Sequence, residues 1–127
     1  MNPLDPHILV VDDDRDSREL WAFALMYAAF RVTSAEDGDA ALAAASIVHP
    51  DLVITDVAMP RMDGVQLTNE LRRHAWMRDV PILGVTGQGD HARARLLAAG
   101  ASHVMQKPCC PDELVAIVRE YLHRRSA

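Results

Sequence analysis

The chain has 127 residues, a length that suits one domain, and half of them are hydrophobic, which is enough for one sizeable core. Its net charge of -5 argues against a generic nucleic-acid binder. No apolar run approaches the ~18 residues of a membrane-spanning helix, so neither nucleic acid nor a membrane is expected as a partner. The two cysteines are adjacent, at Cys109 and Cys110, and no signal-peptide pattern precedes them, so we expect reduced thiols in a cytoplasmic protein.

Apolar runs typical of buried strands alternate along the chain with apolar residues at helical spacing. In chain order we predict a strand at residues 7–11, a helix at 15–29, a strand at 30–34, a helix at 39–48, a strand at 52–55, a helix from 63 to near 74, a strand at 80–85, a helix at 90–99, a strand at 102–106 and a helix from 111 onward. This order predicts an α/β fold: a doubly wound parallel sheet of five strands with five helices on its two faces. Residues 1–127 are expected to form a single domain.

Local signals mark several helix boundaries. Asp14 suits the start of the first helix, and Asp63 with Gln66 resembles a capping box. Gly100 is a natural C-terminal cap. Trp21 lies among the apolar residues of the first helix and is expected in the core or at its rim rather than at a ligand.

Polar side chains follow the C-terminal ends of four predicted strands. Asp12 and Asp13 follow the first strand, and Asp56 follows the third. Thr86 follows the fourth strand and Lys107 the fifth. Because the C-terminal ends of parallel strands share one edge of the sheet, where such folds bind ligands, we expect these five side chains to converge. Three clustered carboxylates repel one another, and a hard divalent cation such as Mg²⁺ relieves that repulsion by taking oxygen ligands.

These residue types suit the transfer of a phosphoryl group to a carboxylate. A carboxylate can act as the nucleophile and form an aspartyl-phosphate, while Mg²⁺ neutralises charge during the transfer. Lys107 can pair with phosphoryl oxygens as a compact cation, and the Thr86 hydroxyl can donate a hydrogen bond to them. Taken singly, each residue is more simply a loop residue, a helix cap or a surface charge. Their joint position at strand ends favours one site.

The sequence resembles a response-regulator receiver domain of two-component signalling over its whole length. The matching motifs are residues 8–14, Asp56 with Met59-Pro60 and Met62-Asp63-Gly64, Thr86, Gly100-Ala101 and Lys107-Pro108. The resemblance implies a flavodoxin-like sheet of order 2-1-3-4-5. It also implies a phosphorylation-activated switch that receives its phosphoryl group from a phosphohistidine of a sensor histidine kinase or a phosphotransfer protein. Such a switch then signals by contacting a downstream protein, which the sequence does not identify.

The resemblance implies a role for each site residue. Asp56 is the phosphoacceptor. Mg²⁺ is held by Asp13, by Asp56, by the backbone carbonyl of Ala58 and, through a water molecule, by Asp12. Lys107 holds the phosphoryl group, and its peptide bond to the following proline is expected to be cis.

The sequence also departs from the family pattern. Receivers use Thr86 as a switch that moves with an aromatic residue three positions before the lysine, but that position here is Val104. We therefore expect phosphorylation to be reported by residues 87–89 and the helix that follows. Ala58 offers no polar side chain to a hydrolytic water, so we expect a long-lived phosphoryl group, with Gln88 as a partial substitute.

Surface residues of two helices are candidates for partner contacts. Arg15 and Arg18 on the first helix would meet the phosphodonor. The expected output face, made of the fourth helix, fifth strand and fifth helix, has these candidates: Arg93, Arg95, Val104 and Arg119.

Other functions share part of this pattern. A Mg²⁺-dependent phosphatase or mutase that forms an aspartyl-phosphate usually has a second Asp two residues after the nucleophile, where this chain has Ala58. A degenerate binding module would not need the intact set of five polar residues. We therefore expect no enzyme beyond a receiver that catalyses its own phosphotransfer and dephosphorylation. A stand-alone receiver, a phosphorelay shuttle and a receiver excised from a hybrid kinase or a longer regulator all fit the sequence.

Overall fold

The structure is a computed structural model that describes residues 2–87 and 89–126. Strands and helices alternate along the chain as the sequence predicts, each boundary lying within two residues of the expected one. The elements are β1 (His7–Val11), α1 (Arg15–Tyr27), β2 (Arg31–Ala35), α2 (Gly38–Val48), β3 (Leu52–Asp56), α3 (Gly64–Arg72), a short 3₁₀ turn η1 (Ala75–Met77), β4 (Ile82–Thr86), α4 (Asp90–Ala99), β5 (His103–Gln106) and α5 (Pro111–Ser126).

Two of the boundaries that differ from the expectation have clear local reasons. Helix α1 ends at Tyr27 rather than residue 29, because Ala29 takes a left-handed backbone conformation with φ 71°. Strand β4 begins at Ile82 rather than residue 80, after Pro81, which has no N–H for the ladder. The η1 turn was not predicted.

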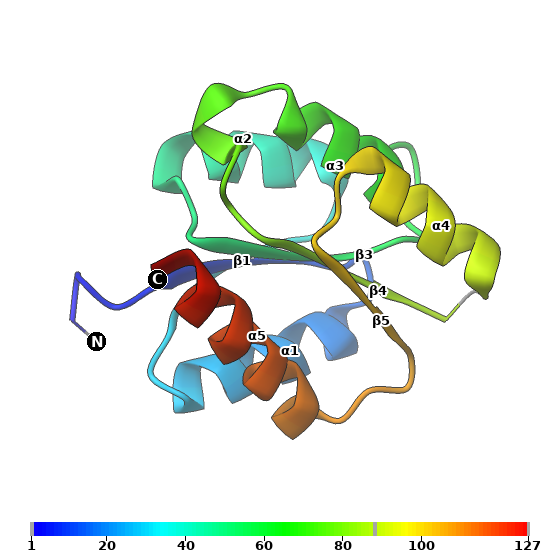
Figure 1. Ribbon diagram of the computed structural model, residues 1–127. Helices are drawn as coiled ribbons and strands as arrows, with labels where there is room; N and C mark the ends of the chain where they lie inside the picture. The colour runs from blue at the N-terminus through cyan, green and yellow to red at the C-terminus, as the bar shows by residue number, and fades with distance from the viewer. Residues whose placement is uncertain (1, 88, 127) are drawn as a thin grey trace.

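The five strands form one parallel sheet in the order β2-β1-β3-β4-β5, which confirms the expected order. Helices α1 and α5 cover one face of the sheet, and α2, α3 and α4 cover the other (Figure 1). The chain reverses its direction of winding between β1 and β3, so the crevice at the C-terminal ends of these two strands lies at the topological switch point.

Strands β1, β3 and β4 are buried on both faces because helices cover both sides of the sheet. Successive side chains of a strand point to opposite faces. Ile8 and Val10 of β1 therefore pack with Trp21 in the layer under α1 and α5. Leu9 and Val11 pack in the layer under α2 and α3. Trp21 lies in the core, as the sequence predicts.

The predicted caps are present. The Asp14 carboxylate accepts a hydrogen bond from the backbone N–H of Ser17 at the start of α1. Asp63 and Gln66 form the reciprocal capping box of α3. Gly100 ends α4 with φ 112°, a left-handed conformation that favours glycine.

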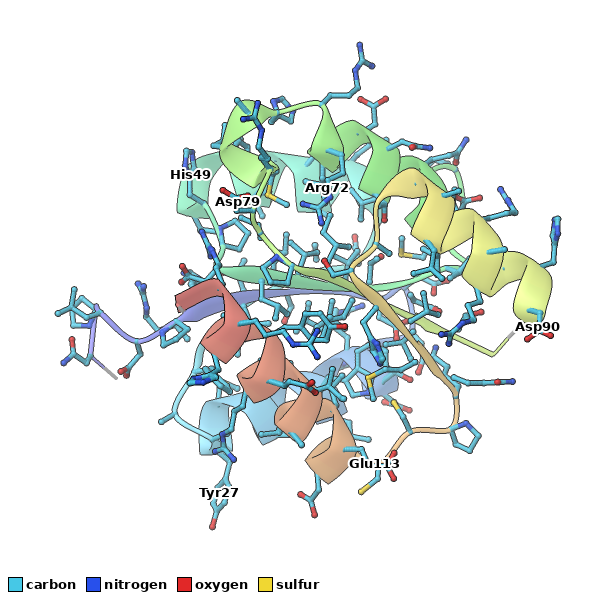
Figure 2. All side chains as sticks on the ribbon, in the orientation of Figure 1. Tyr27, His49, Arg72, Asp79, Asp90 and Glu113 are labelled. Atoms are coloured by element: carbon cyan, nitrogen blue, oxygen red, sulfur yellow. The ribbon has the colours of Figure 1, made fainter. Side chains whose placement is uncertain are left out.

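Arg72, at the end of α3, joins three connections on the α2–α3–α4 side of the sheet (Figure 2). Its guanidinium donates hydrogen bonds to the carbonyls of Met77, Val80 and Gly100. These bonds satisfy backbone groups around η1 and the turn before β5. Within residues 2–87 and 89–126, no helix is long and apolar enough to cross a membrane.

Candidate functional site

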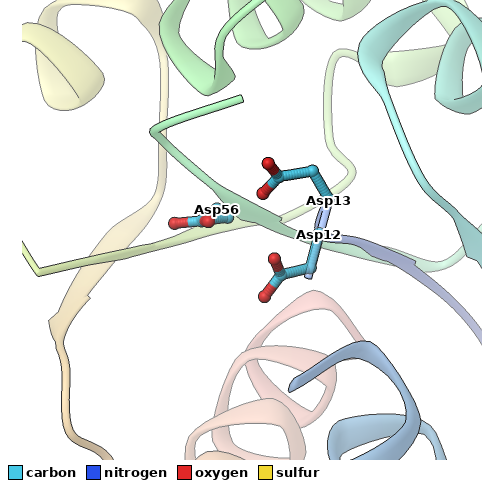
Figure 3. A group of neighbouring side chains, drawn as sticks. All are labelled: Asp12, Asp13 and Asp56. Atoms are coloured by element: carbon cyan, nitrogen blue, oxygen red, sulfur yellow. The ribbon is translucent and has the colours of Figure 1, made fainter. Parts of the chain in front are cut away.

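Three carboxylates meet at the C-terminal edge of the sheet (Figure 3). Asp12 and Asp13 directly follow β1, and Asp56 is the last residue of β3, the strand paired with β1. One carboxylate oxygen from each lies within 4.8 Å of the others. Asp12 is fully buried, Asp56 is 6% exposed and Asp13 is exposed. The group therefore opens to solvent on the side of Asp13.

Only one of the two oxygens of the Asp12 carboxylate accepts a hydrogen bond in the described part of the chain. Its Oδ1 accepts a hydrogen bond from the backbone N–H of Asp14 at 2.9 Å. Its Oδ2 is buried and has no hydrogen-bond partner among the described residues. Burial raises the pKa of Asp12 to about 6, the Asp14 hydrogen bond opposes that shift, and the charge of Asp56 adds to it. An unpartnered buried oxygen beside two further carboxylates is a group that a bound cation would satisfy.

Lys107 supplies positive charge to this group from the end of β5. Its Nζ lies 3.3 Å from Asp56 Oδ1 and 3.8 Å from Asp12 Oδ2. The same ammonium sits 5.5 Å from the centroid of the Trp21 ring, within the range of a cation–π contact. Asp56 Oδ1 also accepts a hydrogen bond from the backbone N–H of Val57 at 2.8 Å. One cation thus lies near two of the three carboxylates and offsets only one of their negative charges.

Thr86 completes the edge from β4. It is 2% exposed, and its backbone carbonyl accepts a hydrogen bond from the Lys107 N–H at 2.8 Å. The Lys107-Pro108 peptide bond is cis, as expected. The structure therefore brings together all five polar residues that the sequence placed at strand ends.

The loop after Asp56 is anchored at its far end by a close backbone approach. The N–H of Gly64 donates to the carbonyl of Val57 at 2.9 Å. A Cβ on Gly64 would collide with the backbone carbonyl of Asp56, so any other residue here would force α3 or β3 to move. Ala58 lies in this loop and is exposed. Its carbonyl is thus on the segment that borders the acidic group.

The middle of the same loop is tied to α2. Arg61, with φ 67°, pairs with Asp37 at 2.8 Å, and Asp37 in turn caps α2 through the Ala40 N–H. Met62 packs on Gly38, where an added Cβ would lie 2.6 Å from the Met62 sulfur. These contacts fix the course of the chain after Asp56.

Sequence reasoning missed two contacts of the site. Trp21 is predicted in the core or at its rim rather than at a ligand, yet its ring also borders Lys107. Arg18 was assigned to a phosphodonor surface, yet its Nη1 donates to the carbonyl of Asp12 at 2.8 Å. Helical spacing indicates which face of α1 is buried, but it does not indicate which strand end that face meets.

The remaining predicted residues lie outside the acidic group. Val104 is 4% exposed and packs with Val57 and Leu96 under α4. Arg93 and Arg95 belong to α4, whereas Arg119 lines a groove between α1 and α5. Gln88 lies outside the described residues.

Comparisons with known proteins place this geometry in a family. A family model described as "Response regulator receiver domain" matches residues 8–119. The chain is 36% identical over 120 residues to the phosphate regulon transcriptional regulatory protein PhoB of Escherichia coli (strain K12), an alignment that covers 94% of this chain and 52% of PhoB. The chain spans about half the length of the curated relatives it matches.

Solved structures match this chain over nearly their whole length, whereas the alignment with PhoB covers about half of PhoB. The chemotaxis protein CheY4 of Vibrio cholerae superimposes with a TM-score of 0.88 at 30% identity, covering 92% of this chain and 98% of that one. The signal receiver domain of a signal transduction histidine kinase from Syntrophus aciditrophicus superimposes with a TM-score of 0.86 at 30% identity, covering 93% and 90%. The sheet order and the helices on its two faces are thus shared with receiver structures.

Proposed function

The chain belongs to the response regulator receiver family, and from that membership we propose that it is a signalling switch activated by phosphorylation of Asp56. The phosphoryl group comes from a phosphohistidine of a sensor histidine kinase or a phosphotransfer protein. In the transfer, one oxygen of the Asp56 carboxylate bonds to phosphorus and the bond from phosphorus to the donor imidazole nitrogen breaks. The electron pair of that bond stays on the imidazole.

The observation that carries this proposal is the distance of 3.3 Å between Lys107 Nζ and Asp56 Oδ1. Asp12 is fully buried, and one of its oxygens is already bonded to the backbone. Asp13 makes no ion pair with Lys107 in the part of the chain that the structure describes. Of these three carboxylates, Asp56 is less buried than Asp12 and, unlike Asp13, has a cation beside it, where an incoming phosphoryl group needs charge compensation.

We propose Mg²⁺ as the cofactor because the donor set consists of carboxylate oxygens. Asp13 and Asp56 would hold the ion directly, the Ala58 carbonyl would add a ligand, and Asp12 would act through a water molecule. When bound, Mg²⁺ neutralises charge on the transferring phosphoryl group. Lys107 orients the phosphoryl oxygens, and the Thr86 hydroxyl donates a hydrogen bond to them. The methyl side chain of Ala58 leaves no acid or amide to position a hydrolytic water, which supports a long-lived phosphoryl group.

We propose that α4 reports phosphorylation in place of an aromatic switch. Val104 has no ring to rotate, and it is buried against Leu96 of α4. The Arg93 side chain of α4 donates to the Val104 carbonyl at 3.3 Å, and Arg95 lies 3.9 Å from Asp63 at the start of α3. These contacts connect α4 to β5 and to the loop after Asp56. Displacement of Thr86 toward a phosphoryl group would therefore act on α4 first.

We further propose that residues 1–127 act as one receiver domain whose output is contact with a downstream protein rather than nucleic acid or a membrane. The receiver would catalyse only its own phosphotransfer and dephosphorylation. Cys109 and Cys110 are free thiols, which supports a cytoplasmic location. A phosphatase acting on small substrates is disfavoured because Ala58 stands where such enzymes usually carry a second Asp.

Incubation with Mg²⁺ and acetyl phosphate, followed by intact-mass measurement, tests the proposal. The wild-type chain should gain one phosphoryl group, and Asp56→Asn should gain none. The matched control is Asp39→Asn, which removes an exposed carboxylate in the first turn of α2 and should leave labelling intact. A wild-type chain that binds Mg²⁺ yet stays unmodified would instead indicate a degenerate binding module.

A further inference from the structure

Helix α1 carries apolar side chains on its outer face as well as on its buried one. Leu20, Phe23 and Tyr27 are 53%, 64% and 96% exposed. Figure 2 shows the Tyr27 side chain pointing away from the protein. These residues, with Ala24 and Ala28, form one wall of an open groove of about 600 Å³ between α1 and α5. A surface helix normally turns its apolar residues to the core, so this second apolar face indicates a contact surface.

The α5 wall of the groove carries opposite charges at its two ends. It is formed by Asp112, Val115, Ala116 and Arg119, which lie on one face of the helix. An acid and a base stand at its two ends, ~10 Å apart at 1.5 Å per residue, and two small apolar residues lie between them. Within the described residues, neither Asp112 nor Arg119 makes an ion pair.

We propose that the α1–α5 groove binds a second copy of this chain. The two α5 helices run antiparallel about a two-fold axis that passes between Val115 and Ala116. This reversal places Asp112 of each copy opposite Arg119 of the other, so both unpaired charges gain a partner. The small side chains at the centre let the helices approach closely, and the exposed rings of Phe23 and Tyr27 are covered.

The order of charges selects a second copy over an unrelated partner. A face that reads acid, apolar, apolar, base is complementary to itself when it is reversed. A different protein would need a surface with these complementary charges, whereas a second copy of the chain already has them. The same surface continues toward the acidic group, because Leu20 also lines a pocket of about 370 Å³ with Trp21 and Lys107.

Self-association therefore covers part of the α1 surface beside Lys107. This consequence rests on the proposed function, since it implies that a protein phosphodonor and a second copy compete for Leu20. The self-association itself does not depend on phosphorylation. It is tested without any phosphodonor, so that its failure and the failure of the proposed function are distinguishable.

Sedimentation equilibrium of the full chain over a range of concentrations tests the proposal. The apparent mass of the wild-type chain should rise toward twice the monomer mass. Asp112→Arg and Arg119→Asp should each weaken dimerisation at least tenfold, because like charges then face one another. An equimolar mixture of the two variants should regain the doubled mass, since a copy with two arginines meets a copy with two aspartates. This recovery also shows that both variants fold.

The matched control is Glu113→Arg, which makes the same change of charge at the neighbouring residue of α5, outside the groove. It should dimerise like the wild-type chain. A wild-type chain that stays monomeric at millimolar concentration overturns the proposal. The groove would then be assigned to a phosphodonor protein. Single variants that dimerise normally, or a mixture that stays monomeric, overturn the pairing of Asp112 with Arg119.

Discussion

The Lys107 ammonium lies 3.3 Å from Asp56 Oδ1 and so joins the end of β5 to the end of β3 across the intervening strand β4. The same ammonium lies 3.8 Å from Asp12 Oδ2. In the absence of a metal ion, this side chain is the nearest compensation for two neighbouring carboxylates. One lysine therefore offsets part of the negative charge of the site, and this partial compensation has measurable consequences.

Replacing Lys107 with methionine should make the stability of the protein depend more strongly on Mg²⁺. The substitution keeps most of the side-chain volume but leaves Asp12 and Asp56 without their cation. The free energy of unfolding in EDTA should fall by roughly 1–3 kcal/mol, and Mg²⁺ should restore part of it. Urea denaturation with EDTA and with Mg²⁺ measures both effects. Equal unfolding midpoints for the variant and the wild-type chain in EDTA would show that Lys107 does not compensate these carboxylates.

Asp12→Asn should stabilise the metal-free protein while weakening its response to Mg²⁺. Asparagine can still accept the hydrogen bond from Asp14, but it removes a buried charge whose Oδ2 accepts no hydrogen bond among the described residues. The expected gain in EDTA is about 1 kcal/mol. Asp13→Asn is the matched control, because Asp13 is exposed and its loss should weaken only the Mg²⁺ response. Destabilisation of Asp12→Asn in EDTA would contradict this prediction.

Gly64→Ala should destabilise the protein by about 1–3 kcal/mol and impair labelling by acetyl phosphate. The new methyl group would collide with the backbone carbonyl of Asp56, so either α3 or the phosphoacceptor strand must move. Gly87→Ala is the control, since a Cβ at Gly87 meets nothing within 4 Å. Thermal unfolding and intact-mass labelling of both variants measure the contrast. Two variants of equal stability would rule out the close approach.

Phosphorylation should change the amide NMR signals of α4 more than those of α2. The reason is that α4 is connected through Arg93 to the carbonyl of Val104, and through Arg95 to Asp63. Thr86→Ala should reduce the change in α4 without preventing phosphorylation of Asp56. Relaxation dispersion of the phosphorylated and unphosphorylated protein provides the measurement. Unchanged signals throughout α4 would exclude this helix as the reporter.

His7 should make the protein less stable in mild acid. Burial lowers the pKa of His7 below its usual 6.5, the nearby charge of Arg31 lowers it further, and Asp51 acts in the opposite direction. Above pH 6.5 the imidazole is neutral in both states, so it has no effect on stability. As the pH falls from 6.5 through the lower folded-state pKa, the unfolded chain binds the proton more readily and stability is lost.

Urea denaturation at pH 7.5 and pH 5.5 tests this dependence on His7. In the His7→Gln variant, which has no titrating imidazole, the loss of stability between the two pH values should be smaller. Side-chain NMR titration should also place the His7 midpoint below 6.5. A loss of equal size in the variant and the wild-type chain would assign the pH dependence to other groups.

The sequence alone determined the order of elements and the members of the acidic site. Polar residues terminate apolar runs at Asp12, Asp56, Thr86 and Lys107, and such a change marks the C-terminal end of a buried strand. Parallel strands have their C-terminal ends at one edge, so convergence of these residues follows from topology without any knowledge of loop geometry. The helix caps at Asp14 and Asp63 were predictable from the sequence because each cap involves a residue only three positions further along the chain.

Only the tertiary structure decided which side chains meet across that edge. Two contacts join residues that are far apart in sequence: that of Lys107 with Trp21 and the ion pair of Arg61 with Asp37. The lack of a hydrogen bond at Asp12 Oδ2 among the described residues depends on the rotamer of one side chain. The outer face of α1 is a further case. Helical spacing shows that α1 has apolar residues on two faces, but only the position of α5 beside it turns the second face into a groove. Local sequence patterns indicate which residues are buried, whereas the packing of distant segments decides which residues they contact.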